Sequence, residues 1–498
     1  MMMAHTRPFT VCKNRYEVIM EFLLFTASIC MFILSGLIAM SYIEKVMVLD
    51  FGIWARLAVS FMLGLGIISM QMFIYSILSI PFSFFNIAIL WIALTACSYL
   101  VYDRRSSFFA HFKAFDISCL HNLKWYDAIL LLIIASQVMY AFTCAFLMPL
   151  SGWDALAIWF FKARGFFIEK KISPAFLLNA ASHPDYPLLI PLSVAWIYIS
   201  VGKLNDHMAK IMYPLQYVSL LIIFHYLLKK ISSHNNALLF TTLLSLTPRL
   251  MFHSGGFPAM SVELFDYDYI GYADITLSIY FVSFCGFLYL FLLNQNYFFF
   301  TIAVLFLGMG AWTKNEGLTF ALIGVCLIAP CFSNEPRRRL LAISVILAVF
   351  VLPWLAYRLY FGIPGEYFNN LSFTVIPGNI SRLSVIVKAM GKYMFGHITS
   401  FSFTWHGYIL TSLINWRGFL HRPLFVLQAM LLSQIAIYIF IYMISPHDIV
   451  WHLHTSLDRL LLHMLPLAML ITAINVWQKI KPYDLQSRFK SPIHTQSL

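Results

Sequence analysis

Charged side chains are scarce in this chain. Only 11% of its 498 residues are charged, whereas 61% are hydrophobic and 17% are aromatic. Soluble globular domains carry about 25% charged residues. The shortage excludes an ordinary soluble protein and indicates a polytopic membrane protein, in which ~20 apolar residues suffice to cross the hydrocarbon core.

Acidic residues are the scarcer of the charged types. The chain has 21 acidic residues against 33 Lys and Arg, which gives a formal net charge of +12. The basic residues form short clusters between apolar runs, as in membrane proteins whose cytoplasmic loops are positively charged. We therefore interpret the charge as a topology signal and expect no nucleic-acid partner.

Recognisable cysteine patterns are also absent. Most of the 8 cysteines lie within or beside apolar runs, without the spacing of a metal site. We expect packing residues and no disulfide framework. The chain has no repeat of fixed period, no low-complexity linker and no soluble domain. No small-residue cleavage site follows the first apolar run, which predicts a retained span in place of a signal peptide.

What is present is a succession of apolar runs, which predicts an all-α, polytopic transmembrane helical bundle of about 13 spans. The expected spans are 19–43, 57–79, 82–102, 127–147, 207–228, 237–251, 275–293, 297–312, 317–332, 340–361, 392–414, 424–444 and 460–477. The number before Arg104 stays open, since an odd number would place the basic N-terminus outside. Residues 187–202 form a shorter run that begins with prolines, and we expect a half-embedded segment there.

These runs also suggest how the chain is divided. We expect N-terminal spans with a basic cytoplasmic segment (1–126), a core (127–332) with an external loop (148–191), C-terminal spans (333–481) and a polar tail (482–498). Basic clusters such as Lys229-Lys230 are placed in the cytoplasm. This placement puts the loop that carries Asp154 on the extracytoplasmic face.

The external loop is too charged to lie in lipid and too aromatic for an ordinary solvent loop. Residues 154–168 are apolar over most of the helix circumference but carry Asp154, Lys162 and Arg164. This pattern predicts an amphipathic juxtamembrane helix in the membrane interface, with three aromatic residues in the headgroup zone, Trp153, Trp159 and Phe160.

Further ionisable residues are expected on the same face. His183 and Asp185 lie in a turn that two prolines make rigid. An acidic loop ends at Asp274, and Lys314 and Glu316 lie in a short turn between two spans. The last polar group is His447-Asp448 followed by His452, His454, Asp458 and Arg459. Because ionisable residues at membrane depth are costly, their gathering predicts a functional site.

Several of these motifs occur in a recognisable order between residues 153 and 317. They are Gly152-Trp153-Asp154-Ala155, Ile158-Trp159, Lys162-Ala163-Arg164, His183-Pro184-Asp185-Tyr186-Pro187, Tyr272-Ala273-Asp274 and Thr313-Lys314-Asn315-Glu316-Gly317. In them the chain resembles the GT-C superfamily of integral-membrane glycosyltransferases, and within it the bacterial relatives of protein O-mannosyltransferases and of the aminoarabinose transferase that modifies lipid A. The resemblance implies a polyprenyl-phosphate-linked sugar donor, an acidic residue in the first large external loop and a location in the bacterial inner membrane.

Inverting sugar transfer needs a carboxylate that accepts the proton of the acceptor hydroxyl, and positive charge or a metal that stabilises the departing phosphate. We expect Asp154 to be the general base. The residues expected to bind the donor phosphate are Lys162, Arg164, Lys314 and Arg459. Those expected to orient the acceptor or to hold a divalent cation are His183, Asp185, Asp274 and Glu316. Whether a metal binds, and whether the acceptor is a lipid, a glycan or a protein, stays open.

Most of these residues have a structural alternative. Asp154 would cap the helix that follows it, and Lys162 and Arg164 would extend to the lipid headgroups. Asp185 would cap a turn, and Lys314 and Glu316 would pair only with each other. For His452 and His454, an interfacial hydrogen-bonded role is favoured over a zinc site.

Two other functions suit a membrane protein of this composition. A lipid-linked-sugar flippase or other transporter would distribute polar residues through the depth of several spans. An O-antigen-type polymerase or ligase uses the same carrier lipid but relies on arginine and histidine in a large loop, without a carboxylate base. The gathering of carboxylates and cations at one face favours the glycosyltransferase.

Overall fold

The computed structural model of the protein describes residues 15–46, 51–101, 124–256, 269–328, 344, 348–365 and 375–480. Of these residues, 84% are helical and none forms a strand. The predicted all-α fold is therefore confirmed for the part of the chain that the structure describes.

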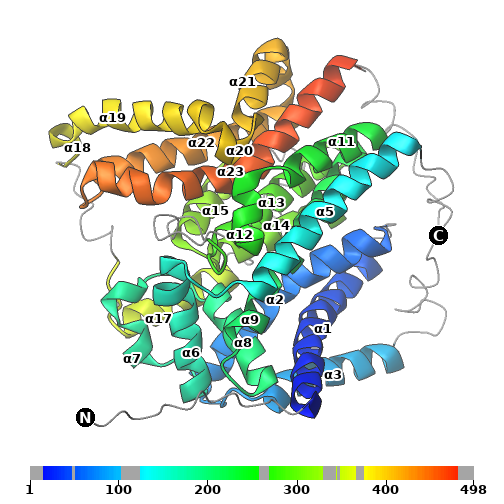
Figure 1. Ribbon diagram of the computed structural model, residues 1–498, viewed down its shortest axis with the longest axis vertical. Coiled ribbons are helices and arrows are strands. Elements are labelled where there is room, and N and C mark those ends of the chain that lie inside the picture. The colour runs from blue at the N-terminus through cyan, green and yellow to red at the C-terminus, as the bar shows by residue number, and fades with distance from the viewer. Residues whose placement is uncertain are drawn as a thin grey trace, which may run out of the picture.

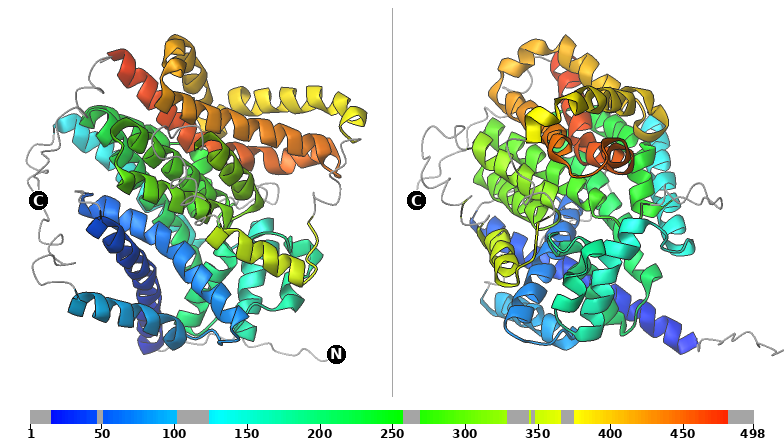
Figure 2. Two further views of the ribbon diagram at one scale, coloured as in Figure 1. Left: turned by 180° about the vertical axis from the view of Figure 1, so that it is seen from behind. Right: turned by 90° about the vertical axis from the view of Figure 1, so that its left-hand side faces the viewer.

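The helices lie in tiers along the longest axis of the molecule (Figure 1). The tier at one end contains α1 (Arg15–Val46), α2 (Ile53–Ile77), α3 (Phe84–Val101), α6 (Phe160–Glu169), α7 (Pro174–Leu177), α8 (Leu189–Val201), α9 (Asp206–Lys210) and α17 (Leu352–Tyr360). The middle tier contains α5 (Trp125–Leu147), α10 (Met212–Ile231), α11 (His234–Ser245), α12 (Pro248–Gly255), α13 (Asp274–Asn294), α14 (Tyr297–Ala311) and α15 (Asn315–Ile328). The opposite end contains α18 (Val375–Gly378), α19 (Ile380–Gly391), α20 (Ile398–Phe401), α21 (Thr404–Ile414), α22 (Arg422–Ile444) and α23 (Ile449–Ile480). The views in Figure 2 show the same order from behind and from the side.

Within the described residues, 7 helices are long and apolar enough to cross a membrane. They are Tyr16–Glu44, Ile53–Ile77, Trp125–Leu147, Asp206–Ile231, Asp274–Asn294, Arg422–Ile444 and Ile449–Ile480. Five apolar helices of 10–17 residues, among them α8, α14 and α15, are shorter. The structure therefore supports a helical bundle with several potential spans, fewer than the predicted count.

The long helices differ in how far the protein itself covers them. In α13 and α23, 94% of the most apolar window is buried, against 17% in α5. A helix that is apolar on all sides needs an apolar environment on all sides. Other helices supply that environment for α13 and α23, whereas the exposed apolar surface of α5 is suited to lipid.

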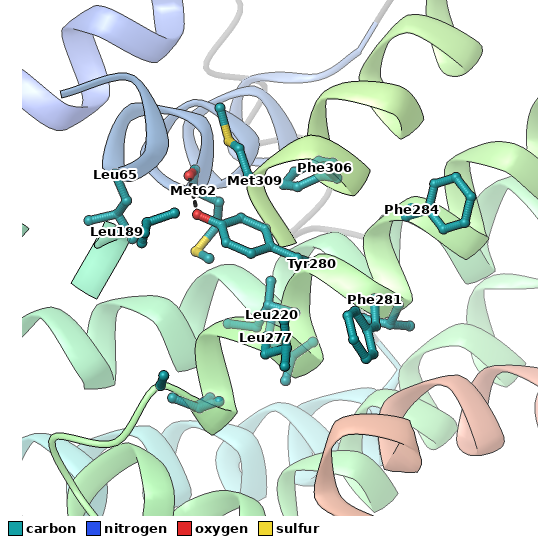
Figure 3. Packing of buried hydrophobic residues seen from close by; sticks show 14 of the residues in the cluster. Met62, Leu65, Leu189, Leu220, Leu277, Tyr280, Phe281, Phe284, Phe306 and Met309 are labelled. Atoms are coloured by element: carbon teal, nitrogen blue, oxygen red, sulfur yellow. Dashed lines mark hydrogen bonds between the residues drawn. The ribbon is translucent and has the colours of Figure 1, made fainter. Parts of the chain in front are cut away.

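Aromatic side chains fill the space around α13. Tyr280 donates a hydrogen bond from its hydroxyl to the carbonyl oxygen of Met62 in α2, at 2.9 Å. Phe281 stacks on Phe320 of α15 with ring centroids 3.6 Å apart. Figure 3 shows Tyr280 and Phe306 among the aliphatic side chains of this core. α13 thus connects α2, in the tier at one end of the molecule, with α15 in the middle tier.

Two predicted spans are wrong as continuous helices. Residues 237–251 are divided between α11 and α12, because Pro248 begins a new helix and has no N–H to continue the first. Residues 392–414 are divided into a π-helical turn, α20 and α21, and Ser402 between the latter two has a positive φ of 52°. Neither segment is a single rod.

The last predicted span is longer than expected. α23 runs from Ile449 to Ile480, whereas 460–477 was the expected range. The carboxylate of Asp448 accepts a hydrogen bond from the backbone N–H of Trp451 at 2.9 Å and caps the helix start. The polar residues from His452 to Arg459 therefore lie on the first turns of a long helix.

Other predictions concern residues outside the described part of the chain. These are the N-terminal residues up to 14, the basic segment 102–123, most of the acidic loop (257–268, with Glu263, Asp266 and Asp268), the triple arginine 337–339 and the tail after 480.

Candidate functional site

Asp154 and Arg459 form an ion pair between segments that are 305 residues apart in the sequence. Asp154 directly precedes a π-helical turn, Ala155–Trp159, but its side chain makes no capping hydrogen bond. Its Oδ2 instead accepts from Nη1 of Arg459, and its side chain is 17% exposed. The capping alternative for Asp154 is therefore wrong.

A second carboxylate, Asp274, lies behind this ion pair at the start of α13. Its Oδ1 is 2.9 Å from Nζ of Lys314 and 2.8 Å from Nε2 of His463. Its Oδ2 lies 3.9 Å from Nη1 of Arg459. The side chain is only 1% exposed. Asp274 thus joins three chain segments in one buried network.

Lys314 reaches Asp274 from the turn between α14 and α15. Its Nζ also lies 3.0 Å from Oε1 of Glu316, so Lys314 and Glu316 do not pair only with each other. The pKa of Lys314 is raised: burial disfavours the charge, but the carboxylates of Asp274 and Glu316 outweigh burial. A Cβ atom on Gly317 would lie 1.9 Å from the carbonyl oxygen of Gly310. Only glycine allows so close a helix approach, which fixes the position of Lys314.

Two turns of α23 provide the remaining polar side chains. Arg459 and His463 are four residues apart and therefore lie on one face of the helix, toward Asp274. His463 is held from its other side by the hydroxyl of Tyr438, 3.0 Å from Nδ1. The adjacent Asp458 points elsewhere and binds Arg249 at 2.9 Å. Asp458 and Arg459 are adjacent on the helix and therefore point in different directions.

The turn before α13 closes the site beside Asp154. Gly271 has a positive φ of 93°, which glycine adopts without strain. This turn directs Tyr272 so that its hydroxyl oxygen accepts the backbone N–H of Asp154 at 3.2 Å. The guanidinium of Arg459 lies over the Tyr272 ring, 5.3 Å from its centroid. Tyr272 therefore contacts both members of the ion pair.

The His183 turn adjoins the same network. Asp185 accepts a hydrogen bond from Nδ2 of Asn315 at 2.8 Å, next to Lys314. Tyr186 stacks with the rings of His183 and Trp159, at centroid distances of 5.0 and 5.5 Å. The turn is therefore tied to both the Lys314 turn and the π-helical turn.

Lys162 is fully buried beneath this turn. Its Nζ donates to the carbonyl oxygen of His183 at 2.7 Å. Burial lowers the pKa of Lys162 to about 7, although the carboxylate of Asp185 acts in the opposite direction. Lys162 therefore does not extend to lipid headgroups.

Arg164 is not part of the network. Its Nη2 lies 2.5 Å from Oδ2 of Asp206, and the hydroxyl of Tyr198 binds the other oxygen of the same carboxylate. No contact of Arg164 with Asp154 or Lys314 is seen among the described residues. Arg164 therefore pairs with Asp206 apart from Lys314 and Arg459, and its role in phosphate binding stays a prediction.

The helix that follows Asp154 differs from the expected interfacial helix. Trp153 is exposed, but Trp159 and Phe160 are 1% and 0% exposed. α6 packs against α8, and these aromatic rings contribute to that core. The prediction that Trp159 and Phe160 face the headgroups is wrong, because aromatic residues on this segment contact protein.

A metal centre receives no support from the described residues, in which no group of three or more His, Cys, Asp and Glu side chains is arranged to hold an ion. His452 instead lies 2.8 Å from the hydroxyl of Ser445 through Nδ1. This contact agrees with the hydrogen-bonded role favoured from the sequence.

Sequence analysis missed three residues that the structure places in or beside the network: His463, Asn315 and Arg249. The first had a usable signal, because His463 follows Arg459 by one helical turn in an otherwise apolar run. Asn315 lies between Lys314 and Glu316, and only the charges of these two neighbours indicated a site. Arg249 had no partner near it in the sequence that would have singled it out.

No protein-family model, no curated protein and no solved structure matches the chain.

Proposed function

We propose that the protein is a membrane glycosyltransferase of the GT-C kind, which transfers a sugar from a polyprenyl-phosphate carrier to an acceptor hydroxyl. In this proposal the site faces the extracytoplasmic side of a bacterial inner membrane. The loop 148–191 lies at that surface, and short apolar helices such as α14 and α15 add to the long spans.

The observation that carries the proposal is the Asp154–Arg459 ion pair. It joins a carboxylate and a guanidinium that are only partly exposed, 17% and 13%. A carboxylate and a guanidinium in contact form a charge-assisted hydrogen bond, and both side chains retain some exposure through which a ligand would reach the pair. A phosphate that binds Arg459 would compete with Asp154 and leave its carboxylate free to accept a proton.

The reaction needs two groups of opposite charge at the reacting centre. The acceptor oxygen forms a bond to the anomeric carbon of the sugar while the bond from that carbon to the phosphate oxygen breaks. The hydroxyl proton moves to the carboxylate of Asp154. The phosphate departs with the bonding electron pair, and Arg459 and Lys314 stabilise its charge.

The buried part of the network has a supporting role in this mechanism. Asp274 holds Lys314 and His463 within 3 Å and faces Arg459. It therefore orients the cations that the phosphate meets, and its own oxygens are occupied. We therefore assign Asp274 the role of positioning these side chains and Asp154 the role of accepting the proton.

Mass spectrometry of envelope lipids and glycans tests the proposal. Cells that lack the protein are expected to lose one sugar modification and to accumulate a carrier-linked sugar. The wild-type gene should restore the product, whereas Asp154→Asn should reduce it by about 10²- to 10⁴-fold, the usual contribution of a general base.

Glu169→Gln is the matched control, because it removes an exposed carboxylate from the same loop. It should restore the product fully. Normal product from Asp154→Asn at equal protein level, or an unchanged lipid profile in cells without the protein, would contradict the proposal.

A further inference from the structure

Two buried side chains beside the Asp154–Arg459 pair have nitrogen atoms without hydrogen-bond partners. Arg249 is 4% exposed and uses Nη2 for Asp458, at 2.9 Å, while its Nε and Nη1 have no partner. His253 is 0% exposed, and both of its ring nitrogens have no partner. Such groups are uncommon in folded proteins, because a buried donor without an acceptor costs about 1–3 kcal/mol. Single unpartnered atoms also occur elsewhere in the described residues, but Arg249 and His253 leave four nitrogens without a partner in one place, where a ligand would supply the missing acceptors.

The two side chains are arranged to contact one ligand. Arg249 and His253 are four residues apart on α12 and therefore lie on the same face. Both pack on Tyr269: the guanidinium lies 4.7 Å from the ring centroid, and the imidazole stacks at 4.7 Å with an interplanar angle of 3°. Burial lowers the pKa of His253, so its imidazole is neutral and offers one N–H donor.

This pair of side chains adjoins the proposed reacting centre. Asp458, which holds Arg249, is the neighbour of Arg459, which holds Asp154. His253 also contacts the ring of Tyr272, at 6.0 Å, and the hydroxyl of Tyr272 contacts Asp154. A group bound by Arg249 and His253 would therefore lie next to the carboxylate and cation of the site.

The other basic residues of the region have their partners. Lys162 donates to a carbonyl, Arg164 binds Asp206, and Lys314 binds two carboxylates. Arg249 differs because Asp458 fixes one side of the guanidinium and leaves Nε and Nη1 to donate. Charge-assisted hydrogen bonds of this kind suit the oxygens of a phosphate ester.

We propose that Arg249 and His253 bind a phosphate-ester oxyanion. Its assignment to the head group of the lipid-linked donor rests on the proposed function, whereas the anion site itself does not. The ligand oxygens accept from Nε and Nη1 of Arg249 and from the one N–H of His253.

Binding of undecaprenyl phosphate to the purified full-length protein in detergent tests this site. Undecaprenol has the same tail without the phosphate, and inorganic phosphate has the anion without the tail. Native mass spectrometry and thermal unfolding measure each ligand. We expect undecaprenyl phosphate to bind and undecaprenol to bind at least tenfold more weakly.

Two variants remove the donors with little other change. Arg249→Lys keeps a cation for Asp458 but loses the free guanidinium donors, and His253→Phe keeps a ring on Tyr269 but loses both nitrogens. Each should weaken binding of undecaprenyl phosphate at least tenfold. Arg56→Lys is the matched control, because Arg56 is also buried, pairs with Glu44 at 2.8 Å and has an unpartnered Nε. It should bind within twofold of wild type.

The outcomes separate the two proposals. Inorganic phosphate that binds with the same sensitivity to both variants would support the anion site and assign it to free phosphate. Wild-type affinity in both variants, equal binding of undecaprenol, or no binding by the wild type would overturn the site. Binding of undecaprenyl phosphate by the wild type without any sugar transfer would contradict the proposed function alone.

Discussion

Asp154 and Asp274 belong to one ion-pair network, yet their surroundings differ. Asp154 follows a loop, has Arg459 as its partner and is 17% exposed. Asp274 begins a buried helix, faces Lys314, His463 and Arg459, and is 1% exposed. A general base must exchange its partner for the substrate, whereas a buried anchor must keep its partners. The difference indicates that Asp154 takes part in the reaction, whereas Asp274 holds the neighbouring side chains in place.

The largest expected effect is a difference in unfolding free energy between variants of the two residues. Asp274→Asn leaves Lys314 and Arg459 with fewer counter-charges in a buried site, which should cost about 3–5 kcal/mol of unfolding free energy. Asp154→Asn should cost only about 1 kcal/mol, because its site is partly exposed and Arg459 keeps Asp274 nearby. Thermal unfolding in detergent, followed by tryptophan fluorescence, measures both. Equal losses of stability would remove the distinction.

The next effect concerns Lys162, which is buried beneath the His183 turn. Its pKa is about 7 in the folded protein against an ordinary value of 10.5. Between these values the unfolded chain binds more protons than the folded one, so the Lys162 contribution makes stability rise with pH. The rise should be about 2 kcal/mol between pH 7 and pH 9.

Lys162→Met should abolish this rise and should be more stable than wild type at pH 6. The exposed Lys171→Met serves as the control and should keep the wild-type pH profile. Unfolding midpoints across pH 6 to pH 9 provide the measurement. A wild-type profile in Lys162→Met would show that Lys162 stays charged in the folded protein.

Gly317 tests how the buried part of the network around Asp274 is held in place. An added Cβ atom would meet the carbonyl oxygen of Gly310 at 1.9 Å and force α14 and α15 apart. Gly317→Ala should therefore lower stability by about 1–2 kcal/mol and displace Lys314 from Asp274. Gly378→Ala, at a position with no atom within 4 Å of the new Cβ, is the control. Similar unfolding midpoints for the two variants would disprove the close approach.

The smallest effect is expected at Arg164. The Arg164–Asp206 pair is 34% and 27% exposed, so removal of one partner should cost less than about 1 kcal/mol. Arg164→Gln should also leave sugar transfer within about twofold of wild type, because Arg164 does not reach the network. A loss of transfer comparable with that of Asp154→Asn would return Arg164 to the phosphate site.

Much of the helical framework could be predicted from the sequence, because the length of an apolar run limits where a helix can begin and end. α13 begins at Asp274 and α22 ends at Ile444, close to their expected bounds. The two interrupted helices were missed because an apolar run continues through the new helix start at Pro248 and through the positive φ of Ser402. Burial of Trp159 was missed because an aromatic residue suits both a membrane interface and a protein core.

The sequence indicated which residues belong to the site better than it indicated which of them contact each other. Costly ionisable residues between apolar runs pointed to Asp154, Asp274, Lys314 and Arg459, and the structure brings them into one network. The pairing of Asp154 with Arg459 depends on tertiary packing across 305 residues, which local patterns do not contain. The same reason explains why the partner of Arg164 was not foreseen.

The most direct test of the account is the single-turnover rate of sugar transfer by Asp154→Asn, measured with the donor that accumulates in cells without the protein. The account predicts a rate about 10²- to 10⁴-fold below wild type, with an unfolding midpoint close to that of Glu169→Gln. A rate within tenfold of wild type would contradict the role of Asp154 as the proton acceptor.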